Sequence, residues 1–150
     1  MDAIDKKLII LLQENFPLVL RPFQVLARRL SVSEYEIIRR VRRLKAGGII
    51  KRIGPVHNPQ NIGYPRRSLV GMLVPESKLK ETVEIVNSFP EVTHNYLRRD
   101  ECFNLWFTLI CPTQKRIDEI ILEIKCKSGI KKLISLPTIR TIKIKTVFKP

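Results

Sequence analysis

The sequence has few of the residues that build metal, disulfide and redox sites. It contains only two histidines, three cysteines and one tryptophan among 150 residues. Two histidines are too few for an ordinary protein-bound zinc site. An odd number of widely spaced cysteines predicts neither a disulfide framework nor a CxxC metal site. We therefore expect no protein-bound metal, and reduced thiols as in a cytoplasmic protein.

Long apolar runs and a leader pattern are missing as well. No run approaches the roughly 18 apolar residues that a membrane span needs. The first residues, Met1 to Lys6, do not form a basic segment followed by an apolar one. The chain contains no GxGxxG or Walker pattern and no internal repeat. These absences argue against a membrane protein, a secreted protein and a nucleotide-binding enzyme.

Positive charge, in contrast, is abundant. The chain has 28 lysines and arginines against 14 aspartates and glutamates, which gives a formal net charge of +14. Such an excess indicates an anionic partner, which is a nucleic acid, an anionic membrane surface or a polyanionic small molecule. The hydrophobic fraction of 44% is high enough for packed cores.

The first third of the chain shows three helix patterns. Apolar residues at helical spacing predict a helix over about residues 2–15, and a second helix begins at a proline, which is tolerated in the first turn. Ser33 followed by Glu36 is a capping-box pattern that starts a third helix. Residues 49–53 predict a short strand, as in a wing. We interpret residues 1–63 as a helix-turn-helix domain with wing and linker.

The remainder, residues 64–150, alternates between strand and helix patterns. Its order βαββαβ predicts an α+β domain of the ferredoxin-like type. The two helices should cover one face of the sheet and leave the other face free for a partner subunit or a ligand. In the last expected strand, Ile142 and Ile144 alternate with Lys143 and Lys145. Strands are expected at 68–74, 92–98, 104–111 and 138–147.

Two surfaces carry candidate functional residues. In the third helix, Arg39, Arg40, Arg42 and Arg43 lie beside the apolar stripe, where they could neutralise the phosphates of DNA.

The open sheet face carries an imidazole, a phenol, an indole and several cations. It has no carboxylate pair or activated nucleophile, so a flat polyanionic aromatic ligand suits it. With side chains alternating along each strand, this face should hold His94, Tyr96 and Arg98 on one strand, and Asn104, Trp106 and Thr108 on its neighbour.

These motifs also resemble known families. The helix-turn-helix resembles that of Lrp/AsnC regulators in the segments Asp5-Lys-Lys-Leu-Ile-Ile-Leu-Leu-Gln, Leu26-Ala-Arg-Arg-Leu and Arg40-Val-Arg-Arg-Leu. The second half is similar to an offshoot of that family, the siroheme decarboxylases of the alternative haem pathway and their haem d1 relatives. The similar segments there are His94-Asn-Tyr, Asn104-Leu-Trp-Phe-Thr and Leu136-Pro-Thr. Relatives can carry a histidine in the turn at 99–103, where this chain has Asp100-Glu-Cys.

The offshoot implies a siroheme decarboxylase subunit. Such an enzyme removes two acetate carboxylates from siroheme and gives didecarboxysiroheme. It needs no cofactor, since the iron belongs to the substrate, and haem is an alternative ligand. The resemblance also implies a paralogous partner in a heterodimer, with a homodimer as the alternative. The other interpretation of the whole chain is a DNA-binding Lrp/AsnC-type regulator that responds to haem or an amino acid.

The resemblance, together with side-chain chemistry, gives each residue an expected role. His94 is the first candidate general acid because its unperturbed pKa lies near neutrality, and it is alternatively an iron ligand. Tyr96 is the second candidate, and Arg98 would hold a spectator carboxylate. The remaining expected substrate-binding residues are Asn95, Arg99, Asn104, Trp106, Arg140 and Lys143.

Overall fold

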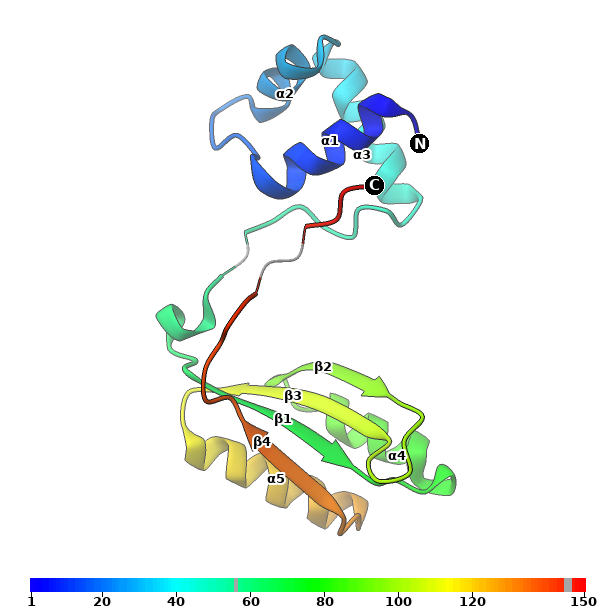
Figure 1. Cartoon of the computed structure of the whole chain (residues 1–150), viewed down its shortest axis with the longest axis vertical. Coiled ribbons are helices and arrows are strands. Elements are labelled where there is room, and N and C mark those ends of the chain that lie inside the picture. Colours follow the sequence, from blue (N-terminus) through cyan, green and yellow to red (C-terminus); the bar gives the residue numbers. More distant parts are fainter. Residues whose placement is uncertain (56, 145–146) are drawn as a thin grey trace. The chain divides into compact units, whose positions relative to one another are not determined.

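The computed structural model describes residues 1–55, 57–144 and 147–150. It divides into two compact units, each drawn in Figure 1. One is a helical unit made of Met1–Val56 with Lys143–Pro150, and the other is a sheet unit made of His57–Ile142. None of the described helices is both long and apolar enough to cross a bilayer.

The helical unit contains the three helices that the sequence predicts. They are α1 (Ala3–Glu14), α2 (Pro22–Leu30) and α3 (Glu34–Ala46). Ser31, in the turn between α2 and α3, adopts the left-handed conformation (φ 54°) that closes α2. The helices bury one apolar cluster: Leu8, Leu26, Ala27, Ile37, Val41 and Leu44.

The expected capping box of the third helix is only half present. The Ser33 hydroxyl accepts a hydrogen bond from the N–H of Glu36, but the Glu36 carboxylate binds arginines instead of the Ser33 backbone. The complete reciprocal box lies at α1, where Asp2 and Asp5 each accept the other's backbone N–H. An acid pair thus fixes the start of α1.

The predicted strand at 49–53 is wrong, and no strand occurs in the described residues between α3 and Val56. The N–H groups of Ile49 and Ile50 both donate to the carbonyl of Leu44, so this segment prolongs the end of α3. A strand needs a neighbour to pair with, and none is present beside this segment within the described chain.

The end of the chain groups with the helices. From the sequence we expect residues 64–150 to form the second domain; of the described residues at its end, 143, 144 and 147–150 group with the helical unit. There the side-chain amide of Gln13 donates to the carbonyl of Phe148 and accepts from its N–H. These two hydrogen bonds resemble those between paired β-strands, and they hold the backbone of Phe148 against α1.

The sheet unit follows a short 3-10 helix, η1 (Pro59–Ile62). Its strands are all antiparallel to their neighbours, in the order β2-β3-β1-β4. Both helices lie against the same face of the sheet, as Figure 1 shows, so the predicted ferredoxin-like class is confirmed. The elements are β1 (Arg66–Met72), α4 (Glu76–Asn87), β2 (Val92–Leu97), β3 (Leu105–Cys111), α5 (Gln114–Ser128) and β4 (Leu133–Pro137).

The core of this unit lies between the sheet and its two helices. On β3, alternate residues are fully buried beneath the helices, and the residues between them are half-exposed on the other face. The helices contribute Ile117, Ile120 and Ile124 of α5 and Val86 of α4. All three cysteines are free thiols. Cys111 is buried in this core, while Cys102 and Cys126 are exposed.

The final strand lies earlier than the sequence predicts. We expected it at 138–147, but β4 ends at Pro137, and the described residues beyond it form no strand. Ile142 and Ile144 alternate with lysines as strand residues do, yet their side chains are 92% and 73% exposed. Ile134 and Leu136 alternate in their place on β4. Lys145 lies outside the described residues.

Candidate functional site

The open face of the sheet carries the central candidate residues. On β2 and β3, His94 pairs with Thr108 and Tyr96 pairs with Trp106. Residues paired across two strands point to the same face, so the structure confirms that these four side chains share one surface. The rows continue onto β1 and β4 through Leu69 and Leu136 beside Thr108, and through Gly71 and Ile134 beside Trp106.

A β-bulge at Thr93 sets the orientation of His94. The register shifts between Val92 and His94, which leaves Thr93 as an extra residue on β2. Val92 can therefore pack against the core while His94, two residues later, lies on the opposite face. The Thr93 hydroxyl lies 3.0 Å from Nδ1 of the imidazole. Within the described chain, Nε2 has no hydrogen-bond partner.

The imidazole and the phenol form a stacked pair. The ring centroids of His94 and Tyr96 are 6.1 Å apart, and the rings are inclined by 24°. Both side chains are exposed, so a ligand on this face can reach both. An imidazole and a phenol hydroxyl are thus held side by side on β2, directly after the bulge at Thr93.

The indole of Trp106 packs over Gly71 on the open face of the sheet. Its Nε1 donates to the carbonyl of Phe103 at 2.7 Å, and the Phe103 ring meets it edge-on at 5.8 Å. The absent side chain of Gly71 makes room for the six-membered ring, because a Cβ there would lie 2.9 Å from Cζ3. The indole is thus fixed in orientation and half-exposed, as a stacking platform requires.

The side-chain amide of Asn104 is engaged in hydrogen bonds to the backbone. Its side-chain Oδ1 accepts from the N–H of Val74 at 2.8 Å, and its Nδ2 donates to the Val74 carbonyl at 2.7 Å. These bonds tie the start of β3 to the chain leaving β1. Because both amide groups are engaged with backbone, we correct the expectation that Asn104 sits freely beside Trp106 on the open face.

Arg98 and Arg99 lie in the turn after β2. The N–H of Arg98 donates to the carbonyl of Asn104 at 2.7 Å, which closes the β2–β3 ladder. With Asn104, the two arginines line a shallow hollow of about 360 Å³ that also includes Glu76 and Leu79 of α4. Since α4 covers the other face of the sheet, this hollow is separate from the His94–Tyr96 stack.

The other expected ligand contacts are also dispersed. The Asn95 amide Nδ2 donates to Asn87 of α4 at 3.0 Å, so Asn95 faces the helices rather than the open face. Arg140 and Lys143 lie in coil beyond β4, because the strand on which we expected them ends at Pro137. The sequence pattern thus identified the stacked core of the site but not its cations.

Arg67, which lies on β1 with Leu69 and Gly71, was not among the residues predicted for this face. Alternation on β1 gives the signal, since Ser68, Val70 and Met72 are buried beneath the helices. The intervening residues, Arg67 among them, must therefore lie on the open face.

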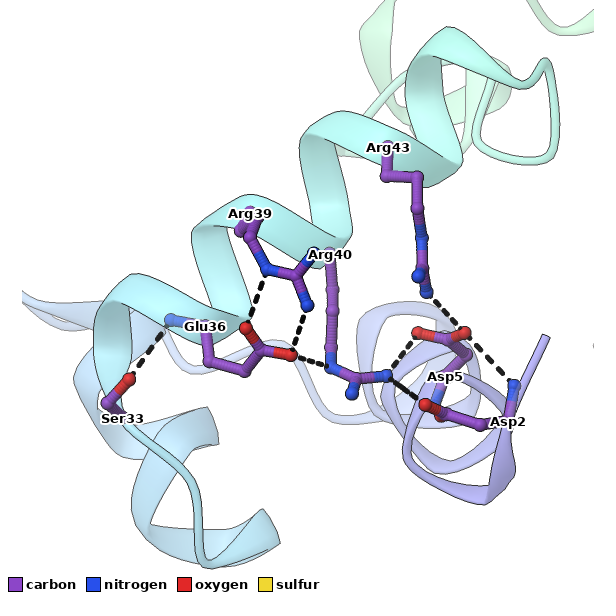
Figure 2. Close-up of polar contacts among 7 residues, drawn as sticks. All are labelled: Asp2, Asp5, Ser33, Glu36, Arg39, Arg40 and Arg43. Carbon is purple, nitrogen blue, oxygen red and sulfur yellow. Dashed lines mark hydrogen bonds and ion pairs between the residues drawn. The ribbon is translucent and has the colours of Figure 1, made fainter.

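The arginines of α3 were expected to be free for DNA, but three of the four are engaged (Figure 2). Arg40 is buried, with only 8% of its surface exposed, and its guanidinium donates to Asp2, Asp5 and Glu36. We therefore correct the expectation that Arg40 is exposed, because Asp2 and Asp5 at the start of α1 face it. Arg39 binds Glu36 and Arg43 binds Asp5. In the described chain, Arg42 has no ion pair or hydrogen bond.

The arginines shift the acidity of these carboxyls. The hydrogen bond from Arg40 is the main cause that lowers the pKa of Asp2 to about 2. The hydrogen bond from Arg39, followed by that from Arg40, lowers the pKa of Glu36 to about 2. Burial alone would raise the pKa of Asp5, but the Asp2 N–H and the guanidinium of Arg40 outweigh it, and the pKa lies below its usual value. The cluster therefore stays charged at neutral pH.

Comparison with known proteins first defines the class. Residues 61–143 match the AsnC-like ligand binding domain, and residues 5–51 match the siroheme decarboxylase NirDL-like helix-turn-helix domain. The fold is also that of Escherichia coli AsnC, with a TM-score of 0.87, 20% sequence identity, and coverage of 100% of this chain and 99% of that one. The chain thus has the two-domain Lrp/AsnC architecture.

Two curated relatives narrow the assignment. The chain is 38% identical to the siroheme decarboxylase alpha subunit of Desulfovibrio desulfuricans, over 99% of this chain and 84% of the relative. It is 36% identical to the siroheme decarboxylase NirD subunit of Stutzerimonas stutzeri, over 95% of this chain and 91% of the relative. The chain belongs to the siroheme decarboxylase family, as its residues suggested.

Proposed function

We propose that this chain is a siroheme decarboxylase subunit of haem biosynthesis, a carboxy-lyase that converts siroheme to didecarboxysiroheme. The observation that carries the proposal is the 38% identity to a siroheme decarboxylase subunit across 99% of the chain. The stacked His94–Tyr96 pair beside Trp106 supports it, because it supplies the proton chemistry and the aromatic platform that this reaction needs.

Siroheme would lie flat on the open sheet face. A planar macrocycle can stack on the half-exposed indole of Trp106 and cover the apolar side chains of Leu69 and Leu136, which are 41% and 43% exposed. The net charge of +14 favours a ligand with many carboxylates. The stack of His94 and Tyr96 would then lie beside one acetate at the periphery of the macrocycle.

On each of the two acetates that react, the chemistry is a replacement of the carboxylate by a proton. A general acid protonates the macrocycle, the bond from the methylene carbon to the carboxylate breaks, and CO2 leaves. The methylene is then protonated to a methyl group and the macrocycle releases the proton that it had taken up, so each reacting CH2–COO⁻ gains one net proton and loses CO2. We assign the proton donation to His94 and the orientation of the substrate to Tyr96. The iron remains part of the substrate throughout.

A second, paralogous chain completes the enzyme in this proposal. The relatives are described as alpha and NirD subunits, which supports an assembly of more than one chain. The engaged arginines of α3 support an enzyme rather than a DNA-binding regulator, because their charges already neutralise acids of the same unit. A homodimer is the alternative assembly.

Anaerobic incubation with siroheme tests the proposal. The chain would be incubated alone and with the protein encoded by its similar-sized genomic neighbour, and the tetrapyrrole followed by mass spectrometry. We expect loss of two CO2 units, and activity that depends on the second chain identifies the heterodimer. An unchanged mass with the correct partner present would refute the decarboxylase assignment.

A further inference from the structure

Arg67 is a cation built into the open face of the sheet. It lies on β1, in register with Ile110 of β3, and one alternation away from Leu69. Leu69 in turn shares a row with Thr108 and His94. Ile110 and Arg67 are both half-buried. Arg67 therefore belongs to the same surface as the stacked rings rather than to the edge of the domain.

The guanidinium of Arg67 is not fully satisfied. Its Nε is buried and has no hydrogen-bond partner, and the described residues offer it no acid in an ion pair. A buried donor without an acceptor is costly, and it is uncommon in native proteins. Other arginines of this chain show the opposite situation, since Arg116 donates through Nε to Glu91 at 2.8 Å. Within the described residues, the guanidinium of Arg67 thus keeps unused hydrogen-bonding capacity.

Arg67 is also the cation best placed for a ligand on this face. The described strands contain two lysine or arginine residues, Arg66 and Arg67, and Arg66 pairs with buried Cys111 on the helix-covered face. The two arginines beside the hollow, Arg98 and Arg99, lie near α4. An anion lying on the open face thus meets one strand-borne cation.

We infer that Arg67 binds a spectator carboxylate of the anionic tetrapyrrole and thereby sets the position of the macrocycle relative to His94. This inference rests on the proposed function. Arg67 and His94 lie on β1 and β2, with β3 between them, and are offset by two residues along the strands. This arrangement separates their backbones by about 12 Å. That distance suits a ligand whose carboxylates surround a macrocycle, because a group on one side can be held while another reaches the imidazole. A planar guanidinium is suited to hold a carboxylate through two parallel hydrogen bonds.

Titration with siroheme under anaerobic conditions, with binding followed by quenching of Trp106 fluorescence and by the absorption of the ligand, tests the inference. Trp106 is the single tryptophan of this chain, so the emission reports this face alone when the chain is titrated without its partner. We expect R67Q to weaken binding about tenfold or more and R67K to weaken it less, because lysine keeps the charge but loses the fork. The matched control is R66Q, on the neighbouring residue of the opposite face, which should bind like the wild type.

The outcomes separate this inference from the proposed function. If the wild-type chain with its partner neither binds nor decarboxylates siroheme, the proposed function fails. If the wild type binds and turns over while R67Q and R67K have unchanged affinities, the role of Arg67 is overturned. Should R67Q lose its fold by circular dichroism, the affinity of R67K relative to R66Q decides. Turnover gives a second readout, since a binding role predicts a raised KM with a smaller change in kcat.

Discussion

Gly71 and Trp106 lie directly opposite each other on adjacent strands, and the indole occupies the space that a side chain on Gly71 would fill. A Cβ at this position would come within 2.9 Å of Cζ3 and 3.0 Å of Cη2 of the ring, and within 3.2 Å of Ile134 on the other side. Contacts this short require the ring to move. The flat seat of the indole therefore depends on glycine at this position.

The substitution G71A tests this dependence. We expect the indole to tilt away from the strand, with a shift in Trp106 emission and a loss of siroheme affinity of about tenfold, while the sheet stays folded. G54A is the control, since a Cβ there meets nothing within 4 Å. Unchanged emission and affinity in G71A would show that the indole can be accommodated without the glycine.

His94 should be required for turnover more than for binding. We expect H94A to lower kcat by about 10²- to 10⁴-fold, the usual contribution of a general acid, with little change in siroheme affinity. H57A, which removes the only other histidine of the sequence, should be indistinguishable from wild type. A shifted absorption band of bound siroheme in H94A would instead identify His94 as an iron ligand, and unchanged turnover would exclude both roles.

Removing the buried partner of Arg40 should destabilise the helical unit. The Asp5 side chain is 1% exposed and binds both Arg40 and Arg43. D5A removes one acceptor from the buried guanidinium of Arg40 and the acceptor of Arg43, so we expect it to cost about 3 kcal/mol of unfolding free energy in urea. The exposed Lys127–Glu123 pair of α5 provides the control, and E123A should cost under about 1 kcal/mol. Equal losses in the two variants would contradict the structural role of the cluster.

Acid should loosen the helical unit over a defined range. Because the pKa values of Asp2 and Glu36 are lowered to about 2 from 3.8 and 4.5, these ionised groups stabilise the fold fully above their ordinary values. That contribution decreases as the pH falls from about 4.5 and is lost near pH 2. Thermal unfolding followed by circular dichroism should show the decrease, and a D2N/E36Q variant should show a flatter pH profile. Identical profiles would contradict the ion-pair network.

The sequence predicted the parts of the fold that depend on local periodicity. Alternation on β3 correctly separated Leu105, Phe107 and Leu109 from Trp106, because one face of an antiparallel sheet is buried. The same logic failed for Ile142 and Ile144, which alternate without a neighbouring strand. Periodicity describes a preference of the chain, whereas a strand exists only where its backbone can pair.

The candidate site was predictable in its aromatic centre and not in its charges. His94, Tyr96 and Trp106 were found because they occupy alternate positions on two adjacent strands. The burial of Arg40 depends on acids in α1, more than thirty residues away in the sequence. A run of arginines in the sequence does not show whether its partners are phosphates or the protein's own carboxylates. Tertiary contacts decide between the two.

The β-bulge at Thr93 places a hydroxyl beside His94 and leaves the strand pairing on either side unchanged. Val92 and Tyr96 keep their places in the sheet on either side of it, and its hydroxyl contacts both Nδ1 of His94 and the Thr108 carbonyl. A one-residue deletion here would restore regular pairing while removing the group beside the imidazole. Deleting Thr93 therefore separates the contribution of its hydroxyl from that of core packing, because Val92 and His94 can keep their partners Leu109 and Thr108 on β3.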